Sequence, residues 1–301
     1  MMAVPKEPVL RGTLLFDEPM ARHTSWRVGG PAQRFYAPAD LADLAVFLRS
    51  LPLDEELLWL GLGSNLLVRD GGIAGTVIAL HAALNTLELI APSTVRTEAG
   101  VPCAKVARFC ARNNLVGAEF LVGIPGTMGG ALAMNAGAFG GETWAHVVAV
   151  ETIDRHGNVR TRHPEDFQIG YRHVQGPAGE WFVAAQLGLQ AGDGAAAQVR
   201  SKELLEQRNR TQPTNQPSCG SVFRNPKGDY AARLIEAAGL KGHRIGGACV
   251  SEKHANFIVN TGMASAADIE ALIEHVARTV EQVHGVKLVR EAHIVGECSH
   301  G

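Results

Sequence analysis

The 301-residue sequence lacks the features that mark several large classes of protein. Its 28 lysines and arginines are outnumbered by 30 acidic residues, so the basic excess typical of nucleic-acid-binding proteins is absent. No stretch approaches the ~20 uninterrupted apolar residues that span a bilayer. The N-terminal segment Met1–Leu15 has no apolar run of signal-peptide length. We therefore expect no nucleic acid and no membrane among the partners, and a cytoplasmic location.

Cysteine and metal-binding patterns are also scarce. The five cysteines form no C-x-x-C pair, which argues against a disulfide scaffold and a structural zinc site and favours a reducing compartment. The 12 histidines include no H-E-x-x-H motif. His243 and His254 have no second ligand at metal spacing, so we interpret both as structural or substrate-lining. The sequence predicts no metal site.

Two familiar nucleotide-binding motifs are missing as well. The P-loop is absent because no Gly-Lys-Ser/Thr occurs. The segment Gly61-Leu-Gly-Ser-Asn65 follows a predicted strand, but Leu66 occupies the third glycine position of a dinucleotide fingerprint. A second strand follows where that motif requires a helix. A Rossmann domain is therefore disfavoured, and this segment alone is equally consistent with a plain tight turn.

The sequence does contain a mixture of helix and strand patterns, with 46% hydrophobic residues for a large core. Short apolar runs predict strands at 57–60, 66–68, 76–80, 94–98, 147–154, 181–189, 286–289 and 292–295. Helical spacing predicts helices at 38–49, after Gly100, and at 196–210 and 229–238. A last helix starts at a capping box, Ser265 to Asp268, carries an apolar stripe from Ile269 to Val283 and ends at Gly285.

A small, polar stretch at 190–198 suggests a connector between domains. We divide the chain near it into two subdomains, 1–80 and 81–200, and an α+β domain, 201–301.

The most unusual stretch is the glycine-rich segment 123–141. Pro125-Gly126 and Gly129-Gly130 leave main-chain N–H groups uncovered and Thr127 adds a hydroxyl, so the segment could cradle a pyrophosphate without a lysine. The alternative is a small-residue helix packed against a sheet. We disfavour the helix because each glycine costs it roughly 1 kcal/mol. Two glycine-rich loops, 61–65 and 123–130, then fit a dinucleotide held from both sides.

Three further candidates are uninformative when taken singly. Tyr171-Arg172 is consistent with a solvated surface pair. Ser221 is not part of a G-x-S-x-G elbow, because Phe223 occupies the last position, so a serine hydrolase is disfavoured and a turn serine is the simpler interpretation. The neighbouring Cys219 is more consistent with a buried small residue than with a nucleophile. For Glu291 the simplest interpretation is an exposed glutamate on a strand.

Taken in order, these segments resemble the UDP-N-acetylenolpyruvoylglucosamine reductase family. The resemblance runs from about residue 23 to residue 296 and rests on Gly61–Val68, Gly123–Gly130 with Asn135-Ala-Gly137, Tyr171-Arg172, Gly220–Pro226 and Ser251–Phe257. It implies an α+β fold with two FAD-binding subdomains of the vanillyl-alcohol-oxidase (PCMH) type and a C-terminal α+β substrate domain. Because no tyrosine occurs between Tyr171 and Tyr230, the chain resembles the subclass that lacks a tyrosine loop.

The resemblance also implies an enzymatic activity. It predicts an NADPH-dependent oxidoreductase that converts UDP-N-acetylglucosamine enolpyruvate to UDP-N-acetylmuramate for bacterial peptidoglycan. NADPH would reduce tightly but non-covalently bound FAD, and the hydride would then pass to the β-carbon of the enolpyruvyl group. Arg172 and Glu291 match the family's residues at the substrate carboxylate, and Ser221 matches the residue that protonates the α-carbon. We expect a monomer.

The resemblance carries over residue by residue. The implied FAD-binding residues are Gly61, Gly63, Ser64, Asn65, Leu66, Gly123, Ile124, Pro125, Gly126, Thr127, Gly129, Gly130, Asn135 and Gly137. In the absence of a tyrosine loop, the residues expected to bind the rest of the substrate are Tyr171, Arg208, Arg210, Arg224 and Asn225.

Two alternatives stay open. A flavin oxidase of the same superfamily is disfavoured because neither glycine-rich loop holds a histidine or cysteine for covalent attachment. A UDP-sugar-binding regulatory protein that has lost catalysis is disfavoured because Arg172, Ser221 and Glu291 are all present.

Overall fold

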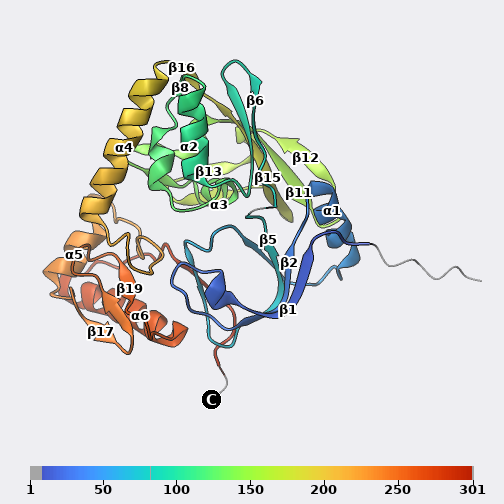
Figure 1. Ribbon diagram of the computed structural model, residues 1–301. Helices are drawn as coiled ribbons and strands as arrows, with labels where there is room; N and C mark the ends of the chain where they lie inside the picture. The colour runs from blue at the N-terminus through green and yellow to red at the C-terminus, as the bar shows by residue number, and fades with distance from the viewer. Residues whose placement is uncertain (1–8, 82, 300–301) are drawn as a thin grey trace, which may run out of the picture.

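The computed structural model describes residues 9–81 and 83–299 and consists of two subdomains and a C-terminal domain (Figure 1). The first subdomain is a four-stranded sheet in the order β1-β2-β5-β3. Its strands are β1 (Thr13–Pro19), β2 (Pro31–Ala37), β5 (Ile73–Ala79) and β3 (Leu57–Leu60). Strand β5 runs parallel to both β2 and β3, and helix α1 (Leu41–Ser50) connects β2 to β3. Of the stretch Met1–Leu15, residues 1–8 lie outside the described part.

The second subdomain is built on a five-stranded antiparallel sheet in the order β12-β11-β15-β7-β6. Its strands are β6 (Leu87–Ala91), β7 (Thr94–Glu98), β11 (Val147–Asp154), β12 (Val159–Arg162) and β15 (Glu180–Gly188). Helices α2 (Cys103–Arg112) and α3 (Met128–Met134) share its hydrophobic core. Short pairs complete it: β8 (Leu115–Val116) with β16 (Gln190–Ala191), β9 (Gly137–Ala138) with β10 (Gly141–Glu142), and β13 (Gln168–Gly170) with β14 (His173–Gln175).

Helix α3 corrects one of our expectations, because part of the glycine-rich segment 123–141 is helical after all. The helix starts after Thr127 and ends at Asn135, which takes up the left-handed conformation with φ of 45°. Its Met128 and Leu132 are fully buried against the sheet. A Cβ on Gly129 would lie only 3.0 Å from that of Ala99. Close packing on the sheet therefore outweighs the intrinsic cost of two glycines in a helix of seven residues.

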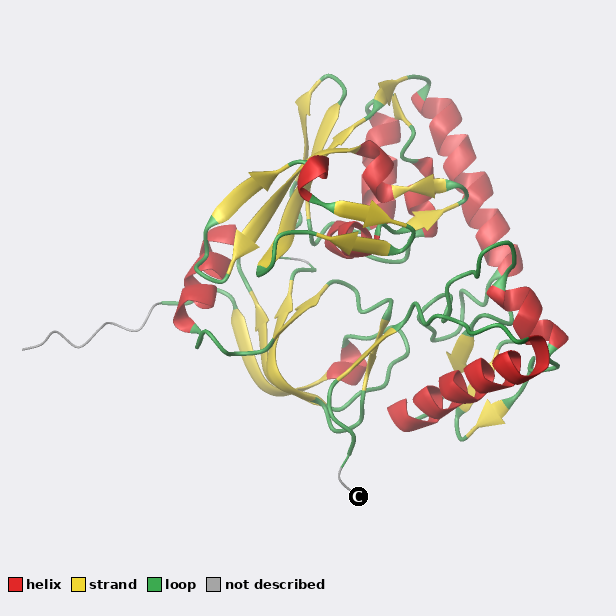
Figure 2. Ribbon diagram, turned by 180° about the vertical axis from the view of Figure 1, so that it is seen from behind, coloured by secondary structure: helices red, strands yellow, loops and turns green. Residues whose placement is uncertain are grey.

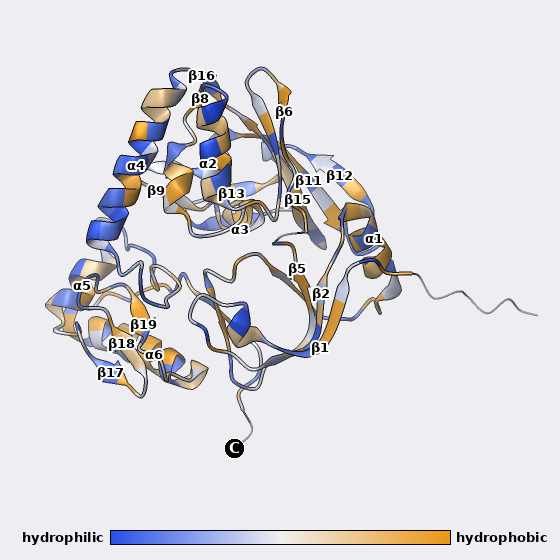
Figure 3. Cartoon of the chain, in the orientation of Figure 1, coloured by the Kyte–Doolittle hydropathy of each residue, from blue (hydrophilic) through white to orange (hydrophobic). Residues whose placement is uncertain are grey.

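Helix α4 (Gly194–Thr211) runs along one side of the molecule from the second subdomain to the C-terminal domain (Figure 1). Its buried Leu204 belongs to the core of the second subdomain. The boundary expected after residue 200 therefore falls inside one continuous helix. Figure 3 shows hydrophilic colouring along much of α4, which fits a helix that buries only one side. Neither α4 nor any other helix within 9–81 and 83–299 has the length and apolar content needed to cross a bilayer.

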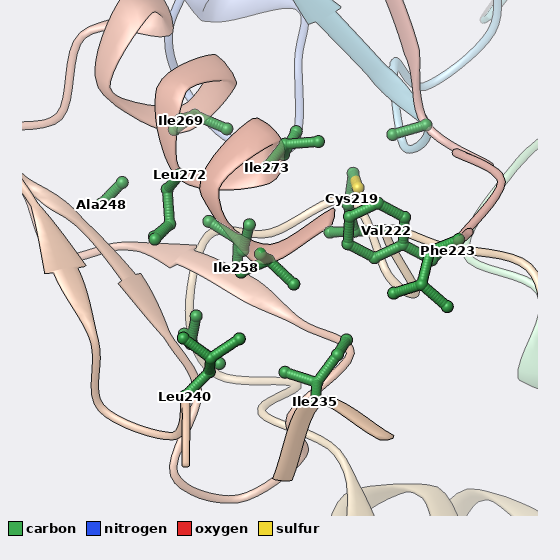
Figure 4. Packing of buried hydrophobic residues seen from close by; sticks show 14 of the residues in the cluster. Cys219, Val222, Phe223, Ile235, Leu240, Ala248, Ile258, Ile269, Leu272 and Ile273 are labelled. Atoms are coloured by element: carbon green, nitrogen blue, oxygen red, sulfur yellow. The ribbon is translucent and has the colours of Figure 1, made fainter. Parts of the chain in front are cut away.

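The C-terminal domain packs a three-stranded antiparallel sheet on two helices. Its elements are β17 (Arg244–Ile245), β18 (Ala248–Val250), β19 (Ile258–Asn260), α5 (Ala231–Ala237) and α6 (Ala266–His284). The predicted capping box at Ser265 and the C-cap at Gly285 are both present on α6, and Ile269, Leu272 and Ile273 lie in the domain core (Figure 4). Val283 is 57% exposed, so its predicted place in the buried stripe is wrong. The core ends at Val280, one turn before the helix does.

The chain then returns to the first subdomain. Strand β20 (His293–Val295) pairs in parallel with β4 (Leu66–Val68), far from it in sequence. The strand predicted at 286–289 is not formed. This stretch is followed by an isolated bridge between Phe223 and Arg290, and a single bridge provides no continuous ladder.

Several hydrogen bonds fasten the C-terminal domain to the first subdomain. The indole N–H of Trp26 donates to the carbonyl oxygen of Ile258 at 2.8 Å, and Arg69 forms a bidentate ion pair with Glu270 at 2.8 Å. The carboxylate of Asp70 accepts from the first two main-chain N–H groups of α6, each at 2.9 Å. Figure 2 shows the result from behind, with the three parts grouped around a centre rich in loops.

Candidate active site

The two glycine-rich loops face each other across the interface between the subdomains. A side chain on Gly61 would clash with the hydroxyl of Thr127, and a Cβ on Gly126 would lie 3.3 Å from the hydroxyl of Ser64. Each loop therefore needs glycine where the other approaches. Segments 61–65 and 123–130, which the sequence singled out separately, form the two sides of one site.

A cavity of about 270 Å³ opens beside these loops. Of the residues expected to bind FAD, it is lined by Gly61, Thr127, Gly129 and Gly130. Apart from its chain neighbours and the backbone of its own helix, no described residue lies within 4 Å of the position that a Cβ on Gly130 would occupy, so the main chain is uncovered there. This part of the site has the open, small-residue wall that lets a ligand approach the backbone.

The cavity also has an aromatic wall that the sequence did not predict. Trp59 on β3 and Trp181 on β15 stack with ring centroids 5.0 Å apart, and both line the cavity. They come from different subdomains, so only the fold brings them together. In the sequence each tryptophan is a strand residue like any other, and no local pattern distinguishes it.

Several other residues of the expected FAD set have evident packing roles. Leu66 and Ile124 are buried in the cores of their own subdomains. Gly63 has a φ of 59° and lies against the carbonyl oxygen of His23, and a Cβ on Gly123 would meet the ring of Phe139. Their side chains, or lack of one, are accounted for by the fold without a ligand. Pro125, by contrast, is exposed in the loop that precedes α3.

Arg172 and Glu291, from the second subdomain and the C-terminal domain, meet beside the loops. Arg172 Nε lies 3.1 Å from Oε1 of Glu291, and the two side chains are only 17% and 15% exposed. Within the described part of the chain, the buried Nε–H has no partner in hydrogen-bond geometry, so this contact is an ion pair. The Nη2 of Arg172 donates to the carbonyl oxygen of Gly137 at 2.7 Å. Arg172 has a φ of 53°, which is unusual for a residue with a side chain, and its guanidinium lies over the ring of Tyr171.

Two asparagines hold the surroundings of this pair in place. The Nδ2 of Asn65 donates to the carbonyl oxygen of Glu291 at 3.0 Å and lies 3.1 Å from the sulfur of Met134. The Nδ2 of Asn135 donates to the carbonyl oxygen of Gly170 at 3.1 Å, just before Tyr171-Arg172. Asn65 therefore holds the main chain of Glu291 itself, and Asn135 holds the main chain two residues before Arg172.

The third expected catalytic residue is placed near Glu291 by main-chain pairing. The N–H of Glu291 donates to the carbonyl oxygen of Val222 at 2.8 Å, so the segment that follows Ser221 lies against Glu291. Ser221 itself is partly buried in a loop, directly after Gly220, whose φ is 84°. Arg172, Glu291 and the segment that follows Ser221 thus come together from three separate parts of the chain.

Burial and two nearby arginines act in opposite directions on the pKa of Glu291. Burial raises the pKa of its carboxyl group above the usual value, and the positive charges of Arg172 and Arg224 oppose that rise. The interpretation of Glu291 as an exposed strand residue is therefore wrong, because the fold encloses it between three segments. Among the described residues, the buried Nε of Arg224 also has no hydrogen-bond partner. The positive charges of Arg172 and Arg224 thus both act on the carboxyl group of Glu291.

The remaining residues of the expected substrate set lie apart from this pair or have other partners. Arg208 and Arg210 are in the last turn of α4. The Nε of Arg208 donates to the side chain of Gln212 at 3.1 Å, burial lowers the pKa of its guanidinium, and Arg210 is exposed. The side chain of Asn225 accepts from the N–H of Ala231 at 3.1 Å and so caps α5.

Comparisons with known proteins agree with this arrangement. Residues 32–162 match the family model of the FAD binding domain, and residues 212–295 match the model of the UDP-N-acetylenolpyruvoylglucosamine reductase C-terminal domain. The fold class expected from the sequence, an FAD-binding region followed by an α+β domain, is thereby confirmed. The first match extends across both subdomains and the second covers the C-terminal domain.

Whole-chain relatives carry the same name. The chain is 65% identical over 298 residues to the UDP-N-acetylenolpyruvoylglucosamine reductase of Alkalilimnicola ehrlichii, covering 99% of both chains. It is 65% identical over 288 residues to that of Methylococcus capsulatus, covering 96% of this chain and 95% of the relative. The crystal structure of the reductase from Thermus caldophilus superposes with a TM-score of 0.81 at 32% identity, covering 95% of this chain and 99% of that one. The chain therefore belongs to the UDP-N-acetylenolpyruvoylglucosamine reductases, a family of FAD-dependent oxidoreductases.

Proposed function

We propose that this protein uses NADPH to reduce the enolpyruvyl group of UDP-N-acetylglucosamine enolpyruvate, which yields UDP-N-acetylmuramate for peptidoglycan. The observation that carries the proposal is the convergence of Arg172, Glu291 and the Ser221 segment at one buried place. A carboxylate-bearing substrate needs cationic and hydrogen-bond-donating groups there, together with a proton donor for the neighbouring carbon.

The residues beside the two loops fit FAD. The cavity of about 270 Å³ adjoins an uncovered main chain at Gly130 and the hydroxyl of Thr127, which together suit a pyrophosphate. The stacked pair Trp59 and Trp181 adds an apolar aromatic wall to the same cavity. Gly61, Ser64, Thr127, Gly129 and Gly130 would hold the cofactor. The chemistry that bound FAD supplies is hydride transfer, from NADPH to the β-carbon of the enolpyruvyl group.

Arg172 and Glu291 would act on the substrate carboxylate. Negative charge builds up on this carboxylate as the β-carbon gains a hydride, and a guanidinium can stabilise it through paired hydrogen bonds. Glu291 can help when it is protonated or when it donates through a water molecule, because an ionised carboxyl group would repel the substrate. The raised pKa of Glu291 favours the protonated form. The unpaired Nε–H of Arg224 is a further donor for an anionic part of the substrate.

Ser221 would complete the reaction by donating a proton to the α-carbon. A serine hydroxyl is a weak acid, so it serves only a strongly basic acceptor such as an enolate. Tyr171, Arg208, Arg210 and Asn225 remain candidates for the sugar and diphosphate. Of these, Tyr171 is the one in direct contact with the pair, through the guanidinium of Arg172.

An anaerobic experiment on the purified protein loaded with FAD tests this proposal. NADPH should bleach the flavin absorbance, and UDP-N-acetylglucosamine enolpyruvate should restore it. UDP-N-acetylglucosamine, which lacks the enolpyruvyl group, is the matched control and should leave the flavin reduced. A flavin that bleaches and ignores the enolpyruvyl sugar would overturn the substrate. A protein that takes up no FAD would overturn the cofactor and favour the binding-protein alternative.

A further inference from the structure

On one side, ordinary main-chain pairing holds the segment that carries Ser221. The carbonyl oxygen of Val222 accepts from the N–H of Glu291, and the N–H of Arg224 donates to the carbonyl oxygen of Val289 at 2.9 Å. Phe223 forms an isolated bridge with Arg290. On this side residues 222–224 are paired with 289–291 as a short antiparallel strand would be.

The other side of the segment is closed by one side chain. The N–H of Phe223 donates to Oδ1 of Asn256 at 3.0 Å, and Nδ2 of Asn256 donates back to the carbonyl oxygen of Phe223 at 2.8 Å. The N–H of Val222 also donates to the main-chain carbonyl oxygen of Asn256 at 2.9 Å. Asn256 is 3% exposed, so water cannot replace these partners readily. Its amide thus offers Phe223 the same donor and acceptor that a neighbouring strand would offer.

The apolar side chains of this segment anchor it to the domain core. Val222 and Phe223 are buried and belong to the cluster that contains Ile258 and Ile273 (Figure 4). Asn256 lies in the turn between β18 and β19, two residues before Ile258. This turn is itself held by Ser251, whose hydroxyl accepts from the N–H of Lys253 at 3.2 Å. The side-chain amide of Asn256 therefore extends from a hydrogen-bonded turn to the main chain of Phe223.

We infer that Asn256 is a positioning residue for Ser221. This inference rests on the proposed function, in which Ser221 donates the proton to the α-carbon. The two residues before the clamped Phe223 are Val222 and Ser221, so the amide of Asn256 fixes the direction in which the chain leaves Ser221. A misplacement of about 1 Å in a reacting group can lower a rate by roughly 10²-fold.

The geometry also explains why an asparagine is required at 256. An aspartate has the same shape, but its second oxygen would face the carbonyl oxygen of Phe223 without a proton between them. An alanine would leave both main-chain groups of Phe223 without a partner. Either change should loosen residues 221–223 while the FAD-binding subdomains stay as they are, because the hydrogen bonds of the Asn256 side chain go to Phe223 in the C-terminal domain.

The test measures both half-reactions in the FAD-loaded protein, for the parent, Asn256→Asp, Asn256→Ala, Ser221→Ala and each double variant with Ser221→Ala. The single changes at 256 should leave flavin reduction by NADPH within about twofold of the parent and slow reoxidation by the enolpyruvyl sugar by about 10- to 100-fold. They should lower the maximal reoxidation rate more than the apparent affinity. In the Ser221→Ala background the same changes should add less than about threefold, because residues that act as a unit are not additive.

A second readout does not depend on activity. Hydrogen exchange of the main-chain amides should become faster at Val222 and Phe223 in Asn256→Ala, with the exchange of β3, β5 and β15 unchanged. Asn260→Asp provides the matched control, because the Nδ2 of Asn260 also donates to a buried carbonyl oxygen, that of Trp26, at 2.9 Å. It should leave exchange at Phe223 as in the parent.

Each result decides one question. Multiplicative losses in the double variants, or equal losses in both half-reactions, would show that Asn256 acts on overall structure and would overturn the inference. Parent-like reoxidation in both Asn256 variants would overturn it while leaving the role of Ser221 intact. If Ser221→Ala itself reoxidised at the parent rate, the failure would lie in the proposed function.

Discussion

Arg172 Nε lies 3.1 Å from Oε1 of Glu291, although the two residues belong to different domains and lie far apart in the sequence. The pair is the point at which the second subdomain meets the C-terminal domain beside the glycine-rich loops. Burial raises the pKa of Glu291 while Arg172 and Arg224 oppose the rise. Two opposed influences therefore act on this carboxyl group: burial favours its neutral form, and the charges of two arginines favour its ionised form.

Replacing Glu291 by glutamine should change how stability depends on pH. Because the folded-state pKa of Glu291 is raised, binding a proton at this carboxyl group favours the folded protein. This contribution to the free energy of unfolding is fully present below the unfolded pKa of about 4.3. That contribution is lost as the pH rises through the folded pKa. The free energy of unfolding of Glu291→Gln minus that of the parent should therefore increase as the pH rises from about 4 through the folded-state pKa of Glu291. Urea unfolding across this range measures it.

Replacing Ser221 by alanine should separate the two half-reactions. Flavin reduction by NADPH should stay near the parent rate, and reoxidation by the enolpyruvyl sugar should slow by about 10²-fold or more, the usual contribution of a positioned general acid. Anaerobic stopped-flow absorbance records both. Ser218→Ala changes a serine in the same loop and should leave both rates unchanged. Parent-like reoxidation in Ser221→Ala would remove Ser221 from the mechanism.

Replacing Gly130 by alanine should have opposite effects on the protein with and without FAD. Outside its own helix and chain neighbours, no residue of the described chain lies within 4 Å of the new Cβ. Because alanine favours a helix over glycine, the FAD-free protein should gain about 0.5–1 kcal/mol. The new methyl group covers the main chain at the cavity, so FAD affinity should fall by about tenfold or more. Thermal unfolding and FAD titration test the two effects. Gly170→Ala also meets open space but does not line the cavity, and it should leave FAD affinity unchanged.

Replacing Asp70 by alanine should weaken the attachment of α6. Ser265 satisfies the third N–H of the helix, and Asp70 reaches from the first subdomain to satisfy the first two at 2.9 Å. Loss of such a capping group costs about 0.5–2 kcal/mol. The free energy of unfolding of Asp70→Ala should fall by that amount, with Asp70→Asn in between because it keeps one acceptor. An unchanged value for Asp70→Ala would mean that water replaces the carboxylate at no cost.

Local patterns in the sequence were sufficient for most elements of the fold. Strands β3, β4, β7 and β11 and the capped helix α6 form where their residue patterns predict them. The exceptions depend on distant residues. Helix α3 forms because it packs against Ala99 and the sheet. Residues 286–289 form no strand, because the only pairing beside them is the isolated bridge between Phe223 and Arg290 among the described residues. Val283 is exposed because the core ends before the helix does.

The sequence by itself determined the family, the two glycine-rich loops and the identity of Arg172, Ser221 and Glu291, since these are properties of residue type and order. Only the tertiary structure decided that Glu291 is buried against Arg172, that Trp59 stacks on Trp181, and that Asn256 clamps Phe223. A side chain's burial, its pKa and its hydrogen-bond partners depend on residues that meet only when the chain has folded. The order of residues along the chain does not specify the distances between these residues in space.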